Sequence, residues 1–204
     1  PSYSFPKNVV RFFVEEESPY GKKYPRVVKY APERDIAVAI SEYAPGRFVT
    51  IDKKIYKSGG IYASPKPHGY DTNQAEFYFG NKDYFNDILV CSECNWFGHK
   101  EDGLDTCPYC HAPVEIRKML KPWGFAPERG DAVKFEDEDE DKTYAEAPYY
   151  SHVPEESQMI PYKGQIRFAN LENRQVLTVN IGKSKHGFNI CRCCGGAELA
   201  DPKN

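Results

Sequence analysis

Short stretches in which apolar and polar residues alternate, separated by turn residues, run through most of this chain. Residues 9–16 and 26–30 show the pattern, and residues 48–51 and 55–57 flank a predicted hairpin turn at residues 52–54. Gly59 and Gly60 follow and are expected to end that hairpin. Because side chains alternate across a strand, the pattern predicts a protein built mainly from short antiparallel strands.

Three later stretches also predict strands. Residues 87–90 lead into a cysteine-rich segment, and residues 165–169 and 175–180 are separated by a predicted turn at residues 170–173. Residues 35–43 are ambiguous. Ile36, Val38 and Ile40 alternate as in a strand, but the alanines between them also suit a short helix.

Composition and charge refine this picture. Fifteen Tyr and sixteen Pro against two Met favour a turn-rich β protein over a helix bundle, and no apolar run is long enough to predict a membrane span. The net charge is −3, but six acidic residues stand together at 136–141. That run and residues 144–156 predict a solvated, mobile insertion; the alternative is an acidic flap that competes with nucleic acid.

Two Cys-x-x-Cys pairs carry the clearest chemical signal. Cys91 and Cys94 are followed, after twelve residues, by Cys107 and Cys110, which supplies the four thiolates of a tetrahedral structural zinc site. Iron in the same geometry is the alternative. A disulfide would need an oxidising compartment, and residues 1–6 lack the features of a signal peptide, so a cytoplasmic location is expected.

A third pair, Cys191 and Cys194, precedes Gly195 in the manner of a zinc knuckle. Only ten residues follow Cys194, and none is Cys or His. Cys193 or His186 would have to complete the site, or the cysteine pairs combine in another way, or the missing ligands lie outside this chain. The last explanation fits best and predicts that the chain is a fragment of a larger one.

Basic residues predict a contact with phosphates. Residues 163–192 hold six Lys or Arg against one acid, although an ordinary basic sheet face is an equally good interpretation. The predicted nucleic-acid-binding residues are Arg47, Lys53, Lys54, Lys57, Lys183, Lys185 and Arg192. Trp96 is expected to pack against the metal turn rather than stack on a base.

No catalytic site is predicted. Four thiolates close the coordination shell of a metal, whereas catalytic zinc keeps one position open. The histidines form no spaced ligand or triad pattern: His68, His99, His111, His152 and His186.

Several segments together resemble a known family. These are residues 1–6 with Val9 and Val10, residues 32–46, residues 56–61 (Tyr-Lys-Ser-Gly-Gly-Ile), residues 179–182 and residues 187–195. They resemble the C-terminal region of bacterial superfamily 2 DEAD/DEAH-box helicases with a cysteine-rich domain, namely the mitomycin-repair type and its relatives in phage-defence systems such as DISARM and Druantia. The resemblance covers nearly the whole chain.

The resemblance implies an accessory region of a DNA-repair or antiviral-defence helicase. No phosphate-binding loop and no motor motif occurs in this sequence, so ATP hydrolysis cannot be assigned to any residue present. The implied role is to position DNA, with RNA not excluded, beside motor domains in the same chain or in a partner subunit. The alternative is a zinc-stapled protein–protein adaptor without nucleic-acid contact.

The expected fold class is therefore mainly β with some α (α+β), made of small antiparallel β modules with an inserted zinc ribbon. Four consecutive segments are expected. They are a β-rich accessory domain at 1–86, a zinc ribbon at 87–121, a proline-rich and acidic mobile insertion at 122–161, and a β-hairpin with an incomplete cysteine knuckle at 162–204.

Overall fold

Most ordered elements are short strands, which confirms the predicted mainly-β α+β class. The computed structural model describes residues 8–17, 26–63, 75–128, 140–152, 155, 158–170 and 175–201. These residues form two compact units: one from residues 1–85, 120–146 and 179–204, the other from residues 86–119 and 147–178. The division into four consecutive segments is a different partition and stays a prediction.

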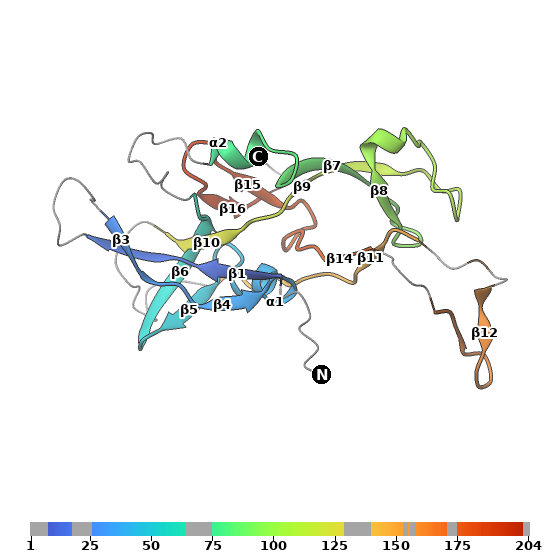
Figure 1. Cartoon of the computed structure of the whole chain (residues 1–204), viewed down its shortest axis with the longest axis horizontal. Helices are drawn as coiled ribbons and strands as arrows, with labels where there is room; N and C mark the ends of the chain where they lie inside the picture. Colours follow the sequence, from blue (N-terminus) through green and yellow to red (C-terminus); the bar gives the residue numbers. More distant parts are fainter. Residues whose placement is uncertain are drawn as a thin grey trace, which may run out of the picture. The chain divides into compact units, whose positions relative to one another are not determined.

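The first unit centres on a five-stranded sheet with the order β4-β1-β10-β6-β5 (Figure 1). Its strands are β1 (Val9–Phe12), β4 (Glu33–Asp35), β5 (Phe48–Ile51), β6 (Lys54–Ile61) and β10 (Gly124–Pro127). β1 and β10 are parallel, and the other neighbours are antiparallel. Along β1, Val10 and Phe12 are buried while Val9 and Arg11 are exposed, as the alternating sequence predicts.

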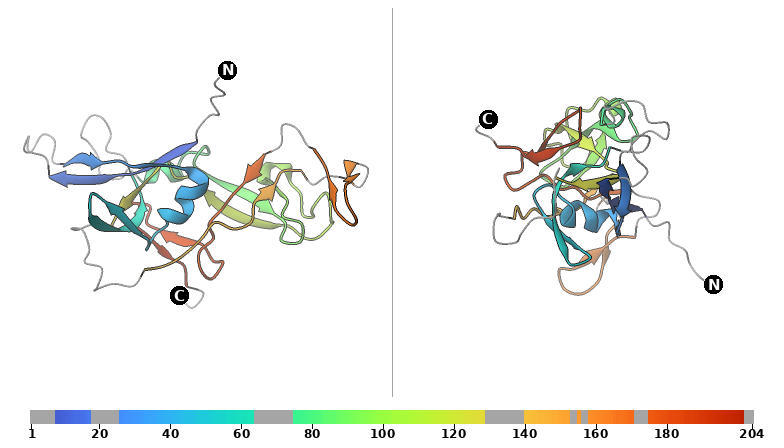
Figure 2. Two further views of the ribbon diagram at one scale, coloured as in Figure 1. Left: turned by 90° about the horizontal axis from the view of Figure 1, so that it is seen from below. Right: turned by 90° about the vertical axis from the view of Figure 1, so that its left-hand side faces the viewer.

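Residues 36–42 form a helix, α1 (Ile36–Glu42), so of the two structures that the sequence allows here the helix is the one present. The Asp35 side chain accepts a hydrogen bond from the Ala37 backbone N–H at 2.9 Å, which caps the first turn. The buried residues Ala39 and Tyr43 are four positions apart and therefore share one helix face. The helix lies alongside β4 and β1 (Figure 2).

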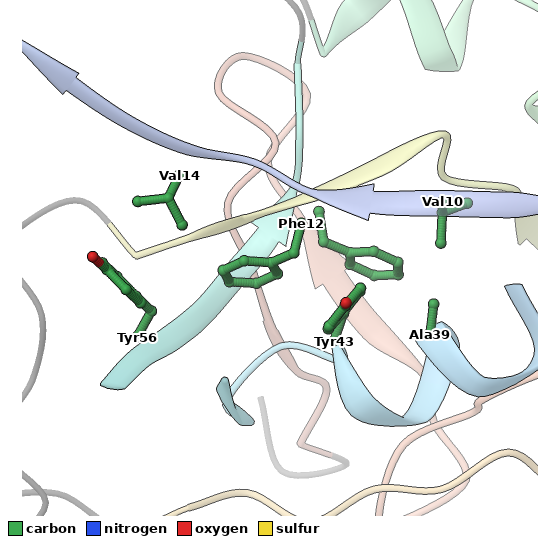
Figure 3. Packing of buried hydrophobic residues seen from close by; sticks show 7 residues of the cluster. Val10, Phe12, Val14, Ala39, Tyr43 and Tyr56 are labelled. Carbon is green, nitrogen blue, oxygen red and sulfur yellow. The ribbon is translucent and has the colours of Figure 1, made fainter. Parts of the chain in front are cut away.

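The hydrophobic core of this unit lies between α1 and the sheet. Ala39 and Tyr43 pack with Val10 and Phe12 from β1 (Figure 3). The Tyr43 ring lies 5.2 Å from the Phe12 ring and 5.9 Å from that of Phe125, measured between centroids. This aromatic cluster fixes the helix against the sheet.

The β5–β6 hairpin confirms the predicted turn, since Asp52 and Lys53 have φ angles of 49° and 60°. The expectation that the hairpin ends at Gly59 is wrong, because β6 continues to Ile61 and pairs with β10. A Cβ on Gly60 would lie 2.2 Å from the Gly195 carbonyl oxygen. The glycines therefore permit close backbone approach instead of ending the strand.

Shorter elements complete the first unit. β2 (Val14–Glu17) pairs with β3 (Arg26–Tyr30), β15 (Phe188–Ile190) pairs with β16 (Ala197–Leu199), and α2 (Glu76–Phe79) is a single helical turn. The end of the acidic run is also packed here: Asp141 N–H donates to the Gly46 carbonyl at 3.1 Å, and Thr143 is buried. Residues 136–139, His68 and the predicted turn positions 171–173 lie outside the described residues.

The second unit contains a three-stranded sheet with the order β8-β7-β9. These strands are β7 (Phe85–Val90), β8 (Phe97–His99) and β9 (Glu115–Leu120), with the short 3-10 helix η2 (Lys100–Asp102) after β8. Two small hairpin-like pairs follow: β11 (Tyr149–Tyr150) with β14 (Val176–Leu177), and β12 (Ile160–Pro161) with β13 (Arg167–Phe168). β13 and β14 lie in the two predicted strands, but they do not pair with each other.

Candidate metal centre

The four predicted cysteines of the first two pairs come together in the second unit. The sulfur atoms of Cys91, Cys94, Cys107 and Cys110 all lie within 4.8 Å of one another. The Cys91 and Cys110 sulfurs are 3.4 Å apart, and those of Cys94 and Cys107 are 3.5 Å apart. A tetrahedral zinc ion with Zn–S bonds of about 2.3 Å separates its sulfurs by about 3.8 Å. The four side chains therefore fit such an ion.

The backbone explains why each pair points both sulfurs to one place. The Cys91 N–H donates to the Trp96 carbonyl at 2.8 Å, and the Cys107 N–H donates to the Ala112 carbonyl at 2.8 Å. In each turn the residue after the second cysteine has a left-handed φ: 56° at Asn95 and 60° at His111. The two turns thus share one geometry, and each is followed by a strand of the same sheet.

The cluster has a small hydrophobic core of its own. Leu89 and Trp96 pack with the buried residues Cys91 and Cys107. Trp96 is only 4% exposed, and its indole N–H donates to the Ser151 carbonyl at 3.2 Å. This burial confirms the expected packing role of Trp96.

Burial raises the pKa of the Cys94 thiol above its usual value, and the hydrogen bond with Cys107 acts in the same direction. A bound cation acts in the opposite direction, because coordination stabilises the thiolate. The donor set of four soft sulfurs suits zinc, and iron in the same shell has the same geometric requirement. Within the described part of the chain, no histidine joins the cluster.

Cys191 and Cys194 form a third turn with the same backbone geometry, in the first unit. The Cys191 N–H donates to the Gly196 carbonyl at 2.8 Å, and Gly195 has a φ of 78°. Among the described residues, no cluster of further Cys, His, Asp or Glu side chains completes a four-ligand shell around this pair. Metal binding by Cys191 and Cys194 stays a prediction.

The seven predicted nucleic-acid-binding residues all belong to the first unit. Arg47 and Lys57 are largely covered, with 18% and 21% of their side chains exposed, and form ion pairs with Glu140 and Glu128. The other five are exposed: Lys53 and Lys54 at the β5–β6 turn, Lys183 and Lys185 in the loop before β15, and Arg192 in the third cysteine turn. Their role in nucleic-acid binding stays a prediction.

Glu140 is a feature that the sequence pattern did not identify. Its carboxylate lies 3.4 Å from the Arg47 guanidinium and also 3.6 Å from the Lys142 ammonium. The Arg47 guanidinium lies 5.6 Å from the centre of the Tyr144 ring. Arg47, which the sequence predicts to bind phosphate, is thus paired with an acidic residue. The only sequence signal for this contact is the acidic run at residues 136–141.

Many proteins combine small β-sheets with a four-thiolate centre, so these features alone do not identify a protein family. The chain is similar to the Druantia protein DruE of Escherichia coli strain UMEA 4076-1, with 31% identity over 211 residues. This similarity covers 98% of the chain but only 11% of the relative's length. The expected similarity to a protein of a phage-defence system is therefore confirmed, while the helicase assignment stays a prediction.

Other comparisons give no further relation. No family model matches the chain, and no solved structure matches it. Across the described residues, none of the helices has the length and apolar character needed to cross a membrane.

Proposed function

We propose that this chain is a zinc-stapled module of a Druantia-type phage-defence protein and that it positions nucleic acid beside an ATP-driven motor. The motor belongs to another part of the same protein or to a partner subunit. The observation that carries the proposal is the coincidence of the four-sulfur cluster with similarity to DruE over 98% of the chain.

Zinc would supply rigidity to the second unit. The cluster around the sulfurs contains Leu89, Trp96 and two cysteines as its buried residues, so two metal ligands make up half of it. Structural zinc contributes folding free energy on the order of 10 kcal/mol in small domains. The four ligands fill the shell, so the metal acts as a staple and not as a catalyst.

The nucleic-acid role is supported by exposed cations on the first unit. Lys53 and Lys54 lie at the tip of the β5–β6 hairpin, and Lys183, Lys185 and Arg192 lie in the loops around β15. Such cations meet phosphates and release counterions, which makes binding strongly salt-dependent. DNA is the proposed ligand, and RNA has the same phosphate chemistry.

One observation favours the adaptor function instead. Residues 86–119, which hold the four-sulfur cluster, contain six acidic residues against three basic ones. Two of those bases are already paired, Lys100 with Asp87 and Arg117 with Glu115. The ribbon itself therefore repels phosphates, and a protein partner suits its surface better than nucleic acid does.

The metal part of the proposal is tested by elemental analysis of the purified chain under reducing conditions. We expect zinc at about one equivalent, lost when Cys91 or Cys107 is replaced by serine. Zinc above one equivalent that is reduced by Cys191→Ser would assign a metal to the third turn as well. Folded, reduced protein without zinc or iron would refute the proposal.

The nucleic-acid part is tested by fluorescence anisotropy with labelled DNA at 50 and 200 mM KCl. Neutralising two phosphate-binding lysines with Lys53→Gln and Lys54→Gln should weaken binding and reduce the salt slope by about 1.4 for single strands. Lys118→Gln, on the ribbon, serves as the matched control. Binding that does not change with salt would exclude the proposed role and leave the adaptor function.

A further inference from the structure

The β12–β13 hairpin, whose strand β12 is labelled in Figure 1, carries four large apolar residues on its two short strands and their connection. Ile160 pairs with Phe168, and beyond them the Tyr162 N–H donates to the Ile166 carbonyl at 2.9 Å. Gly164, with a φ of 56°, forms the connecting turn. Because side chains alternate across a strand, Ile160, Tyr162, Ile166 and Phe168 share one face.

All four of these side chains are exposed. The exposed fractions are 51% for Ile160, 65% for Tyr162, 61% for Ile166 and 48% for Phe168. A two-stranded hairpin without a covered face is marginally stable in water, and a contiguous exposed apolar face marks a binding surface. Among the described residues, this face is therefore a candidate binding surface.

The two aromatic rings contact each other edge to face, with the Lys163 ammonium over the Tyr162 ring. Their centroids are 6.3 Å apart and their planes are nearly perpendicular, at 77°. The Lys163 ammonium lies 5.7 Å from the centre of the Tyr162 ring. Nucleic-acid bases stack on aromatic rings of this kind, and a cation beside the ring meets the adjoining phosphate.

Charge distinguishes this hairpin from the remainder of its unit. Residues 158–170 contain Lys163 and Arg167 and no Asp or Glu, whereas residues 86–119 hold six acids against three bases. An acidic scaffold that presents a basic, aromatic hairpin is complementary to a ligand with both negative charge and planar rings. A single-stranded nucleic acid has both.

We propose that the β12–β13 hairpin binds single-stranded nucleic acid, with Tyr162 and Phe168 stacking on bases and Lys163 and Arg167 facing phosphates. Ile160 and Ile166 complete the apolar surface against which the stacked bases lie. This inference rests on the proposed nucleic-acid function and assigns the contact with bases to the second unit, where none of the seven sequence-predicted cations lies.

The test measures anisotropy of labelled 20-nucleotide dT and U strands, and of a duplex of the same length, with the zinc-loaded chain. Replacing both rings, Tyr162→Ala with Phe168→Ala, should weaken binding of both single strands at least tenfold and leave duplex binding unchanged. Lys163→Gln with Arg167→Gln should reduce the salt slope for single strands by about 1.4.

The matched control is Tyr150→Ala, which removes a 42% exposed ring from β11 of the same unit; it should leave single-strand affinity unchanged. Zinc content and circular dichroism show whether each variant remains folded. If the wild-type chain binds no strand, the proposed nucleic-acid function fails together with this inference.

If the wild type binds but the double ring variant binds equally well, only the hairpin assignment is overturned. The competing explanation is that the apolar face pairs with a second copy of the chain, and sedimentation velocity tests it. A wild-type dimer that the ring variant converts to monomer, with DNA affinity unchanged, would show that the apolar face pairs with a second copy and would overturn the inference.

Discussion

Trp96 serves the four-sulfur centre without offering a ligand atom. Its ring covers Gly98, where an added Cβ would lie 2.5 Å from the indole, and it contacts the buried cysteines from the side. The packing of Trp96 next to the first cysteine turn therefore depends on the absence of a side chain at Gly98.

Gly98→Ala is expected to destabilise the zinc-loaded chain by about 2 kcal/mol, because the methyl group displaces the indole from a packed site. Urea denaturation followed by Trp fluorescence measures this change. Gly80→Ala is the control, since the nearest atom to its added Cβ is the Glu76 carbonyl oxygen at 3.4 Å. Equal stability of both variants would contradict the packing argument.

Cysteine substitutions separate ligand residues from neighbours of similar chemistry. Cys107→Ser removes a fully buried sulfur from the cluster and should reduce zinc content from about one equivalent to below half. Cys193→Ser changes a cysteine outside the cluster and should leave the zinc content unchanged. Colorimetric zinc release with a thiol-modifying reagent measures both, and a full zinc content in Cys107→Ser would show that Cys107 is not a ligand.

At the scale of elements, the cap of α1 helps to explain why residues 36–42 form the helix and not the alternative strand. Asp35→Ala should reduce the free energy of unfolding by about 1 kcal/mol, because it leaves the Ala37 N–H without its acceptor. Asp35→Asn keeps an acceptor and should cost much less. Urea unfolding of the two variants provides the comparison; equal costs would mean that the side chain acts through its charge and not as a cap.

Elements defined by local signals were predicted correctly. The β5–β6 hairpin follows from its turn at Asp52 and Lys53, and the four-sulfur cluster follows from the spacing of two Cys-x-x-Cys pairs. Asp35 is an equally local signal, for the start of a helix. The alternation of Ile36, Val38 and Ile40, which is typical of a strand, kept residues 35–43 ambiguous despite it.

Features that depend on distant partners could not be predicted. Gly60 continues a strand because Ala126 of β10 pairs with it, with an isolated bridge to Gly196, and Arg47 is covered because Glu140 forms an ion pair with it. The predicted strands near residues 167 and 176 form, but strands this short carry too little pattern to specify their partners. The exposed apolar face of β12–β13 also looks, from alternation alone, like a face that packs on a core.

At the scale of the whole molecule, buried tyrosines make stability sensitive to alkaline pH. Burial raises the pKa of Tyr78, whose hydroxyl donates to the Tyr62 carbonyl at 2.6 Å. The folded state therefore keeps this proton above pH 10, where the unfolded state loses it, so stability falls as the pH rises beyond about 10. Tyr78→Phe should be about 1 kcal/mol less stable at pH 8, and this difference should shrink by pH 11.

Denaturation of both proteins between pH 8 and 11 measures the effect. Tyr144→Phe removes a phenol that is 63% exposed and provides the control, since it should leave the pH dependence unchanged. A gap between wild type and Tyr78→Phe that stays constant over this range would show that the hydroxyl contributes only its hydrogen bond.

The stability of the two units should depend on the metal to different extents, because only one of their two described core clusters contains cysteines. Among the described residues, the cluster between α1 and the sheet joins aromatic and aliphatic residues such as Phe12, Tyr43 and Phe125 without a cysteine, whereas two of the four buried residues in the four-sulfur cluster are cysteines. Chelation of zinc under reducing conditions should therefore unfold residues 86–119 and leave the five-stranded sheet intact. Hydrogen exchange with mass spectrometry resolves this: peptides from residues 86–119 should lose protection, while peptides from residues 48–61 should keep it.

Cys107→Ser without chelator should give the same pattern, which excludes an effect of the chelator on the first unit. Loss of protection in both units together would mean that they fold as one cooperative structure and that the metal stabilises the whole chain.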